Sequence, residues 1–302
     1  MGILIRSQEM STGEEDRGLP PFLKRNTLCK PEGAVMEKIK VEHLSKSYGQ
    51  VGVLHDISFS VHEGEFLSIL GPSGCGKTTI LRILIGLEKA DGGTIIKDGK
   101  DITELPSAER RMGIVFQNYA LFENMTVLKN ITYALLHSAV TKGQYNKSKA
   151  EQKAKEMLDL VSLSEHIDKK PGQLSGGQQQ RVAIARTLSL KPDVILFDEP
   201  MSALDVDTRL GLRAELKELQ KQFGTTMIYI THDQEEAFAM SDRIMVMDAG
   251  VIHQLDTSQN IIDHPADDYV KRFVLKNINT KISSLIQFAR LSPAEMSAEV
   301  EK

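Results

Sequence analysis

Residues 71–78 read Gly71-Pro72-Ser73-Gly74-Cys75-Gly76-Lys77-Thr78. A glycine, four further residues and then Gly-Lys-Thr form a loop whose backbone N–H groups surround a polyphosphate. Glycine is required there because a Cβ would obstruct both the loop's conformation and its close approach to the phosphate oxygens. Lys77 is expected to reach the β- and γ-phosphates, and the Thr78 hydroxyl is expected to hold Mg²⁺.

The sequence on either side of this loop has the order that phosphate binding requires. Residues 66–70 predict a buried strand, and residues 79–87 have a helical apolar face that begins at Thr79. The N-terminus of that helix places partial positive charge beneath the phosphates. An incidental glycine-rich turn is the alternative, but it would lack this strand and this helix. We therefore predict an α/β fold in which residues 71–79 bind nucleotide phosphates.

The composition is that of an ordinary globular protein. Of 302 residues, 41% are hydrophobic and 26% are charged, and the net charge of −4 does not indicate a nucleic-acid-binding protein. The two cysteines, Cys29 and Cys75, form no metal-ligand motif and no disulfide framework, which favours a reducing cytoplasm. No apolar run approaches the roughly 20 residues of a membrane-spanning helix, so a membrane role would depend on a partner.

The position of Cys75 in the loop leaves two interpretations of its thiol. A helix N-terminus favours the thiolate, which would make Cys75 reactive. A buried and inert thiol is the alternative.

Residues 1–36 differ in composition from the rest of the chain. They are polar between Ser11 and Gly18 and contain three prolines, so we predict a flexible extension. They lack the apolar segment and the small-residue cleavage site of a secretion signal. Met36 directly precedes the first expected strand and is an alternative translation start to Met1.

Two segments ahead of the loop alternate between apolar and polar residues. These are residues 39–44 and 54–61, with a turn at Tyr48-Gly49 between them, and they predict an antiparallel sheet. After the loop, residues 94–96 and 112–116 predict two more strands, the second of which ends at Gln117.

Residues 128–163 change to a helical pattern. Within them, residues 142–155 are rich in Lys, Gln and Glu, which predicts a solvated helix face or loop. The chain then continues with Leu174-Ser175-Gly176-Gly177-Gln178 and a helical segment at residues 182–188. A serine cap followed by two glycines at a helix start makes a second anion-binding N-terminus.

Polar residues follow two further apolar strands. Residues 194–197 end in Asp198-Glu199, and residues 227–230 end in Thr231-His232-Asp233. Ligands of α/β sheets bind at the carboxyl ends of the strands, so three strand ends direct polar groups at one phosphate site. Asp198 suits Mg²⁺ and Glu199 suits an attacking water.

These motifs together resemble the ATP-binding subunits of ABC transporters, from about residue 39 to residue 273. The most specific of them is the signature, residues 174–178, which follows the phosphate loop at the distance typical of the family. The resemblance implies ATP and Mg²⁺ as cofactors and an ATPase domain over residues 37–275. It also implies a P-loop NTPase core with a mainly parallel sheet, an antiparallel β subdomain and a helical subdomain at about residues 125–190.

The resemblance further implies a role for individual residues. Tyr48 would stack on adenine, and Gln117 would touch Mg²⁺ and the attacking water and sense the membrane partner. Asp198 would lie on the metal side, Glu199 would be the catalytic carboxylate, and His232 would contact the γ-phosphate.

Other motif residues act, by the same resemblance, between two subunits. The signature residues would contact the ATP that the opposite subunit's phosphate loop holds, and Asp205 belongs to a loop that crosses between the subunits. The signature residues in question are Ser175, Gly176, Gly177 and Gln178. A working unit would therefore be a homodimer or a pair with a second ATPase chain.

The segment from residue 231 to residue 265 is similar to bacterial import ATPases that serve polyamines, ferric iron, sulfate, phosphonates, betaines or sugars. This implies integral membrane permease subunits and a solute-binding protein as partners, no nucleic acid, and a peripheral location on the cytoplasmic face of the membrane.

Residues 276–302 depart from many of those import ATPases, which continue into a β-rich regulatory domain. Here a short helical stripe and a capping box predict a helical tail. The tail's expected role is packing on the chain's own core, with a dimer contact or a reduced regulator as the alternative. The residues concerned are Ile278, Ile282, Leu285 and Ile286 in the stripe and Ser292 to Glu295 in the capping box.

An ABC-type ATPase of DNA maintenance or translation is the alternative function. The first class carries a long coiled coil between the phosphate loop and the signature, and the insertion here shows no sustained heptads. The second class usually carries two cassettes, and this sequence has one phosphate loop.

Overall fold

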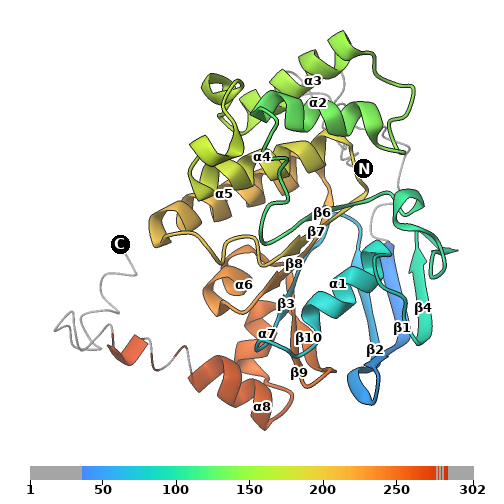
Figure 1. Ribbon diagram of the computed structural model, residues 1–302. Helices are drawn as coiled ribbons and strands as arrows, with labels where there is room; N and C mark the ends of the chain where they lie inside the picture. The colour runs from blue at the N-terminus through green and yellow to red at the C-terminus, as the bar shows by residue number, and fades with distance from the viewer. Residues whose placement is uncertain (1–35, 277, 279, 281, 285–302) are drawn as a thin grey trace, which may run out of the picture. The chain divides into compact units, whose positions relative to one another are not determined.

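Two β-sheets and three groups of helices make up the part of the chain that the computed structural model describes, residues 36–276, 278, 280 and 282–284 (Figure 1). The predicted extension therefore lies outside the described residues, as do Leu285, Ile286 and the predicted capping box. No helix in the described ranges is long and apolar enough to cross a bilayer.

The first sheet is antiparallel and has the strand order β2-β1-β4-β5. Its long strands β1 (Glu37–Tyr48) and β2 (Val51–His62) pair from end to end and bury alternate side chains, as the sequence predicts. Strand β4 (Gly92–Lys97) turns into β5 (Lys100–Asp101) through Asp98 and Gly99. Both turn residues have positive φ, 51° and 73°, which is the conformation that tight hairpins of this length require.

The second sheet is mainly parallel and has the order β10-β9-β3-β8-β7-β6. Its parallel strands are nearly continuous apolar runs because both of their faces are covered. Only β10 runs antiparallel to its neighbour. The strands are β3 (Phe66–Leu70), β6 (Met112–Val115), β7 (Val194–Asp198), β8 (Thr226–Thr231), β9 (Arg243–Asp248) and β10 (Val251–Asp256).

Helix α1 (Lys77–Ile85) follows β3 and lies in the core between the two sheets, with Ile80, Leu81 and Leu84 fully buried. The sequence predicts this helix to Leu87, but it ends two residues earlier. Gly86 closes it in a left-handed conformation, φ 80°, and its N–H bonds back to the last turn. Arg110 donates to the carbonyls of Ile83 and Leu84 in the last turn of the helix.

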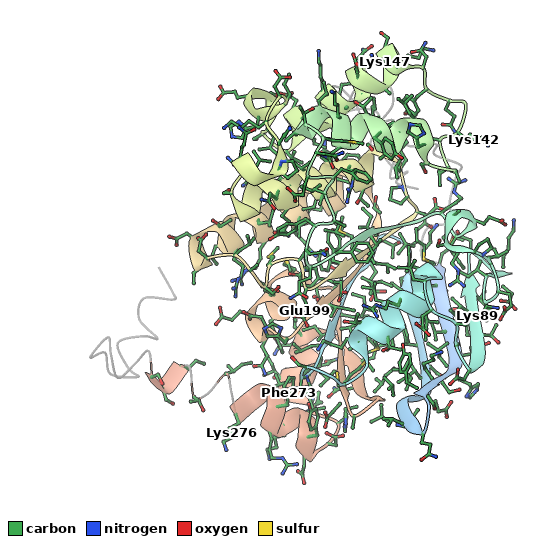
Figure 2. All side chains as sticks on the ribbon, viewed as in Figure 1. Lys89, Lys142, Lys147, Glu199, Phe273 and Lys276 are labelled. Atoms are coloured by element: carbon green, nitrogen blue, oxygen red, sulfur yellow. The ribbon has the colours of Figure 1, made fainter. Side chains whose placement is uncertain are left out.

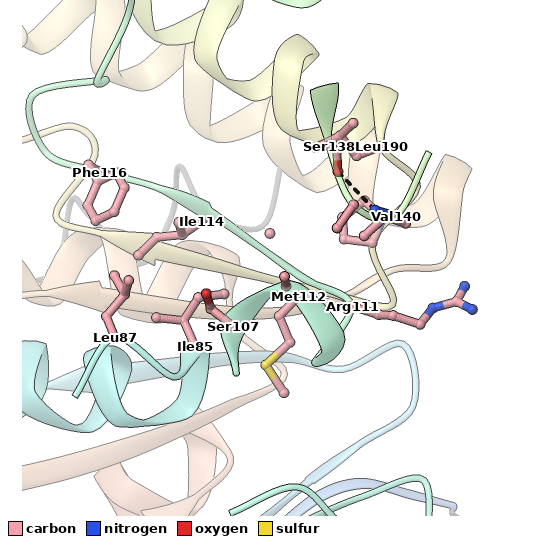
Figure 3. A pocket seen from close by; sticks show the side chains of 14 residues that line it. Ile85, Leu87, Ser107, Arg111, Met112, Ile114, Phe116, Ser138, Val140 and Leu190 are labelled. Carbon is pink, nitrogen blue, oxygen red and sulfur yellow. Dashed lines mark hydrogen bonds between the residues drawn. The ribbon is translucent and has the colours of Figure 1, made fainter. Parts of the chain in front are cut away.

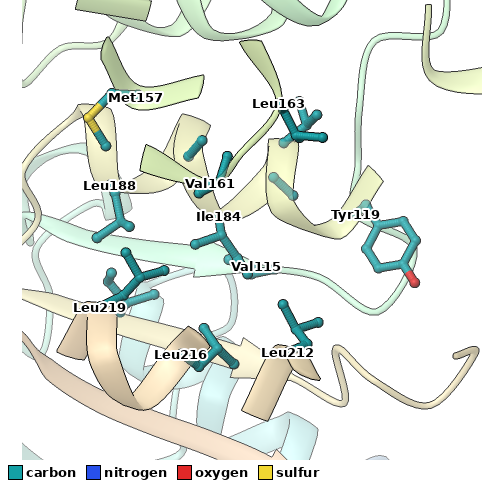
Figure 4. Close-up of a cluster of buried hydrophobic side chains, with 14 of the residues drawn as sticks. Val115, Tyr119, Met157, Val161, Leu163, Ile184, Leu188, Leu212, Leu216 and Leu219 are labelled. Carbon is teal, nitrogen blue, oxygen red and sulfur yellow. The ribbon is translucent and has the colours of Figure 1, made fainter. Parts of the chain in front are cut away.

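Four helices lie on the side of the other face of the parallel sheet, and each begins at a polar residue that accepts a backbone N–H bond (Figure 1). The first two of them pack on each other and on the third, and all four share one apolar cluster with the buried rings of Phe197 and Tyr229, part of which is drawn in Figure 4. The helices are α2 (Val127–His137), α3 (Lys147–Leu160), α4 (Gly176–Ser189) and α5 (Val206–Phe223). Short 3₁₀ turns occur at Ser107–Glu109, Ser164–His166 and Pro171–Gln173.

The predicted solvated run at residues 142–155 is correct in the main and wrong at one residue. Lys142 and Lys147 lie at the outer end of the helical part (Figure 2). Lys153 is buried on α3, and burial lowers the pKa of its ammonium group although Glu156 lies 3.4 Å away. Its long apolar stem allows it to pack beside the helix core, which a count of charges does not reveal.

The C-terminal part of the described chain packs on β9 and β3. Helices α6 (Gln234–Met240), α7 (Ser258–Asp263) and α8 (Asp268–Val270), with the π-helical turn η4 (Lys271–Lys276), share a third apolar cluster with these strands. Ile278 packs against this cluster, whereas Ile282 is exposed. The domain boundaries predicted at residues 36 and 275 stay a prediction.

Candidate nucleotide-binding site

The phosphate loop connects β3 to α1, as its flanks predict. Gly76 has φ 104°, and a Cβ on it would lie 2.7 Å from Leu54 Cδ2 and 3.0 Å from the Val53 carbonyl. Both the conformation and the space therefore exclude a side chain there. The N–H groups of the first turn of α1 face the loop, where an anion is favoured.

Lys77 is buried at the start of α1 and points its ammonium group back into the loop. Its Nζ donates to the carbonyl oxygens of Gly71 at 2.8 Å and Pro72 at 2.9 Å, and it lies 3.9 Å from Glu199 Oε1. The loop therefore surrounds the Lys77 ammonium group, which is positioned to neutralise the charge of a bound phosphate chain.

Thr78 and Asp198 bring two oxygen donors together across α1 and β7. The Thr78 hydroxyl donates to Asp198 Oδ1 at 3.0 Å. Burial raises the pKa of the Asp198 carboxyl above its ordinary value and Glu199 adds to the rise, whereas the Thr78 hydrogen bond opposes it. In the described part of the chain, no group of three His, Cys, Asp or Glu side chains could hold a metal by itself. One hydroxyl and one carboxylate still fit Mg²⁺ that arrives with a nucleotide, because this ion usually takes its other ligands from phosphates and water.

Glu199 follows β7 directly and has a strained backbone. Its φ is 44°, and its N–H donates to the Ile230 carbonyl of β8 at 3.1 Å. Its Oε2 lies 3.0 Å from Nδ1 of His232, which follows β8. Strain of this kind persists only where the surroundings enforce it, and it is concentrated at functional sites. Figure 2 places Glu199 in the middle of the molecule, away from the labelled surface lysines.

Gln117 is linked to the backbone of Glu199 through Ser202. Its Nε2 donates to Ser202 Oγ at 3.0 Å, and Ser202 Oγ donates to the Glu199 carbonyl at 3.0 Å. The sequence assigns Ser202 only to the loop before Asp205. Its link to Gln117 spans 85 positions of the chain, and no local pattern could have indicated it.

A pocket of about 280 Å³ joins these groups. Val53 of β2 lines it without having been expected, and no signal in the sequence marks that residue. The lining residues are Val53, Ser73, Gly74, Gly76, Lys77, Thr78, Thr79, Gln117, Asp198 and Glu199.

Tyr48 stands at the end of β1, outside this lining. Its side chain is 45% exposed, and Lys46 Nζ lies 5.2 Å from the ring centroid. An exposed ring face at the end of a strand can stack on a planar base. The assignment of adenine to Tyr48 stays a prediction.

The signature residues also lie outside the pocket lining. Ser175 caps α4 by accepting from the Gln178 N–H at 3.3 Å, and Gln178 Oε1 accepts from the Ser175 N–H at 3.0 Å. This reciprocal capping box presents the N-terminus of α4 with the Ser175 residue exposed. Asp205 caps α5 by accepting from the Thr208 N–H and hydroxyl, and these bonds lower the pKa of its carboxyl.

The structure corrects the interpretation of Cys75 as a reactive thiolate. The residue is 4% exposed, and burial raises the pKa of its thiol although Lys77 opposes that rise. The pull of the helix N-terminus is too weak to offset the loss of water around the sulfur. The backbone of Cys75 remains part of the loop.

Taken together, the site can bind a polyphosphate, hold a divalent cation beside it and place a carboxylate where water would attack. Thr78 of α1 is hydrogen-bonded to Asp198 of β7, and Glu199 is hydrogen-bonded to His232. The Lys77 ammonium group lies 3.9 Å from Glu199 Oε1, so the three groups lie together at one site. This is the arrangement that phosphoryl transfer to water requires.

Comparisons with known proteins agree with this chemistry. The family model described as "ABC transporter" matches residues 54–202. A dimeric structure of the ATP-binding cassette MJ0796 in a post-hydrolysis state, bound to ADP and Pi, is similar with a TM-score of 0.65 and 33% identity, over 72% of this chain and 98% of that one.

Curated relatives are import subunits. The spermidine/putrescine import ATP-binding protein PotA of Aliivibrio fischeri is 46% identical over 263 residues, 87% of this chain and 68% of that protein. The sulfate/thiosulfate import ATP-binding protein CysA of Pectobacterium atrosepticum is 41% identical over 87% of this chain and 79% of that protein. The chain thus spans about two thirds of the PotA relative's length. These relatives support the predicted import role and not the alternative in DNA maintenance or translation.

Burial of Cys75 predicts slow alkylation. At pH 8 the raised pKa keeps the sulfur as thiol, so iodoacetamide should modify Cys75 of the folded protein at least about tenfold more slowly than a free cysteine, and faster as the pH rises. Mass spectrometry of the peptide that contains Cys75, with the denatured protein as the fully reactive control, measures this. Modification at the rate of free cysteine would restore the thiolate interpretation.

The exposed ring of Tyr48 predicts a measurable share of ATP affinity. Stacking of a base on an aromatic side chain contributes about 1–3 kcal/mol, so Tyr48→Ala should weaken ATP binding about five- to hundredfold. Tyr48→Trp keeps a ring and should retain most of the affinity. Calorimetric titration with ATP measures both, and an alanine variant that binds as tightly as the wild type would move adenine to another part of the surface.

Proposed function

The chain belongs to the ATP-binding subunits of bacterial ABC importers, which hydrolyse ATP with Mg²⁺ to power import, and on this premise we propose how its residues divide that work. The observation that carries the proposal is the convergence on Glu199. Its carboxylate lies 3.0 Å from His232 and 3.9 Å from Lys77, beside the oxygen pair of Thr78 and Asp198.

In the proposed mechanism, positioning and charge neutralisation lower the barrier. The loop amides and Lys77 bind the β- and γ-phosphates, which replace the Gly71 and Pro72 carbonyls as partners of the ammonium group. Thr78 and Asp198 would hold Mg²⁺, which would offset charge on the phosphate oxygens. Glu199 accepts a hydrogen bond or a proton from the attacking water. His232 orients the Glu199 carboxylate and contacts the γ-phosphate.

Gln117 is proposed to report the state of the γ-phosphate. It projects from the end of β6 into the pocket and reaches the Glu199 backbone through Ser202. Binding or loss of the γ-phosphate would therefore act on the Gln117 side chain, and β6, which precedes Gln117, extends away from the nucleotide pocket.

A second copy of this chain, or a related ATPase chain, is proposed to complete the site. Ser175 is exposed at a helix N-terminus that lies outside its own pocket lining, so its anion-binding groups are free to face another molecule. Val206 and Leu210, which follow Asp205 on α5, expose 67% and 54% of their surface. Exposed apolar side chains beside a polar loop are typical of an interface.

A membrane permease is proposed to dock in a second cavity of about 320 Å³ (Figure 3). The end of α1, strand β6, and the segments after α2 and α4 line it. Most of its surface is apolar, with Arg111 extending at one side. Phe116 belongs to this lining and Gln117 to that of the nucleotide pocket, so one peptide bond separates the two sites. An apolar permease segment with a polar flank fits this groove.

We propose that the transported solute is a small molecule that a solute-binding protein delivers to the permease. The relatives named above import polyamine cations and sulfate or thiosulfate anions, at 46% and 41% identity. Similar ATPase chains thus serve solutes of opposite charge, which places solute selection in the partner proteins. Through the permease, the chain is proposed to lie at the cytoplasmic face of the membrane.

The shared-site proposal predicts that Glu199→Gln traps a dimer. This change keeps shape and hydrogen bonding but removes the charge that activates water, so hydrolysis should fall at least about hundredfold while ATP still binds. The variant should sediment as a dimer with MgATP and as a monomer without it. Glu199→Gln combined with Ser175→Arg should stay monomeric, because the added cation obstructs the opposite site.

Two outcomes would contradict this proposal separately. Hydrolysis at the wild-type rate by Glu199→Gln would remove Glu199 from catalysis. A Glu199→Gln chain that stays monomeric at saturating MgATP would instead refute the shared site.

The docking proposal predicts that a charge in the groove releases the permease. Ala139 is exposed at the groove, so Ala139→Asp should abolish copurification of a polytopic membrane protein, identified by mass spectrometry, with the tagged chain. Ile262→Asp adds the same charge at an exposed apolar residue of α7 and should not. Equal recovery with both variants would place the permease elsewhere.

A further inference from the structure

The loop that follows Gln117 is strained in a way that its motif role does not explain. Tyr119 and Ala120 are consecutive residues other than glycine, and both have positive φ, 60° and 46°. L-residues rarely adopt this conformation, and two in succession need support from outside the loop.

Arg186, in the last turn of α4, supplies that support. Its NH1 group donates to the Ala120 carbonyl at 2.7 Å, and its NH2 group donates to the Tyr119 carbonyl at 3.0 Å. Burial lowers the pKa of the guanidinium, yet arginine stays charged at any physiological pH. In the described ranges, no carboxylate lies within ion-pair distance of it. The hydrogen bonds of this guanidinium group therefore go to two carbonyls of a strained loop.

The Tyr119 side chain completes the connection at the other end of α4. The residue is 7% exposed and belongs to the cluster in Figure 4, and its buried hydroxyl has no hydrogen-bond partner in the described part of the chain. A Cβ built on Gly176 would lie 3.7 Å from that hydroxyl and 3.0 Å from Leu204 Cδ2. The first residue of the signature helix therefore lies close to both the Tyr119 side chain and the loop before Asp205, and a side chain at this position would meet both.

We infer that Tyr119 and Arg186 are positioning residues that join the Gln117 loop to the signature helix as one unit. The inference rests on the proposed function. A displacement of Gln117 toward the γ-phosphate moves the carbonyls that Arg186 holds and the Tyr119 side chain close to Gly176. The N-terminus of α4 is thereby aligned with the ATP of the opposite subunit only when the chain's own pocket is filled.

A purely structural role does not account for the choice of these residues. Helix α4 is already anchored by fully buried Val182, Ala183 and Ala185, and Arg181 ties it to Glu215 of α5. A partly buried cation without a carboxylate partner in the described residues is a poor device for stability, since apolar residues of similar volume often stabilise as well or better. What Arg186 adds is a fixed distance between two functional segments.

The test uses the full chain in the Glu199→Gln background. Arg186→Met keeps the length of the side chain and removes both hydrogen bonds. It should weaken the MgATP-dependent dimer about tenfold or more, as measured by sedimentation, while the affinity of the monomer for ATP changes by less than about twofold. Arg186→Lys, which retains the charge without the two-pronged donor geometry, should give an intermediate loss and serves if the methionine variant unfolds. Arg181→Met is the matched control on the same helix and should leave both quantities within about twofold.

A double-mutant cycle with Gln117→Ala separates positioning from stability. If Arg186 acts through the Gln117 loop, Arg186→Met should have less than about a twofold effect on the dimer once Gln117 is alanine. Additive losses, or a dimer that Arg186→Met does not weaken, would overturn the inference while the shared site stands. A Glu199→Gln chain that never dimerises would remove the shared site and the inference with it.

Discussion

Parallel pairing of β3, β8 and β7 is the constraint on which the site depends. In this pairing Leu70 lies opposite Thr231, and Asp198 lies opposite Ile230, so the three strands end at one level. The residue types at those ends then decide the chemistry: a glycine-rich turn after β3, carboxylates at the end of β7 and a histidine after β8. Because side chains of these strands are buried on both faces, their register cannot slip without exposing the core. The functional groups at the ends of these strands are therefore held in fixed relative positions.

The packed strands and helices also hold features that would be unfavourable alone. Glu199 has positive φ, Lys77 is a buried cation, and Arg209 extends from α5 to the Leu204 carbonyl and to Asp233, 3.2 Å away. Arg209 therefore ties the loop before Asp205 to the segment that carries His232. With Arg186, it is the second arginine that joins functional segments far apart in the sequence. The site is thus fixed by long side chains that bridge loops, as well as by the strands that carry those loops.

The sequence predicts most of the fold because its signals are local. The antiparallel sheet, the strand before the loop, the serine cap of α4 and the apolar strands before Asp198 and His232 are all confirmed. The helical pattern predicted over residues 128–163 is broken at residues 138–146, and Asn146 caps the new helix α3. The burial of Lys153 depends on the packing of α3 against α2 and α4, which no periodicity encodes. The same holds for the site. Motif residues could be named from spacing, whereas the contacts of Ser202, Val53, Tyr119 and Arg186 form only on folding. The burial of Cys75 likewise decides between two interpretations that the sequence leaves open.

The strand order implies that different parts of the site differ in local stability. Strands β3, β7 and β8 have a hydrogen-bonded neighbour on each side, but β6 lies at the sheet edge and pairs with β7 alone. Amide hydrogens of an edge strand exchange with solvent through smaller fluctuations than those of interior strands. Lys77, Glu199 and His232 follow the interior strands β3, β7 and β8, whose amides we expect to exchange slowly. Gln117 follows β6 at the edge of the sheet. The groups that would bind the nucleotide are therefore carried by interior strands, whereas the glutamine proposed to sense it follows an edge strand.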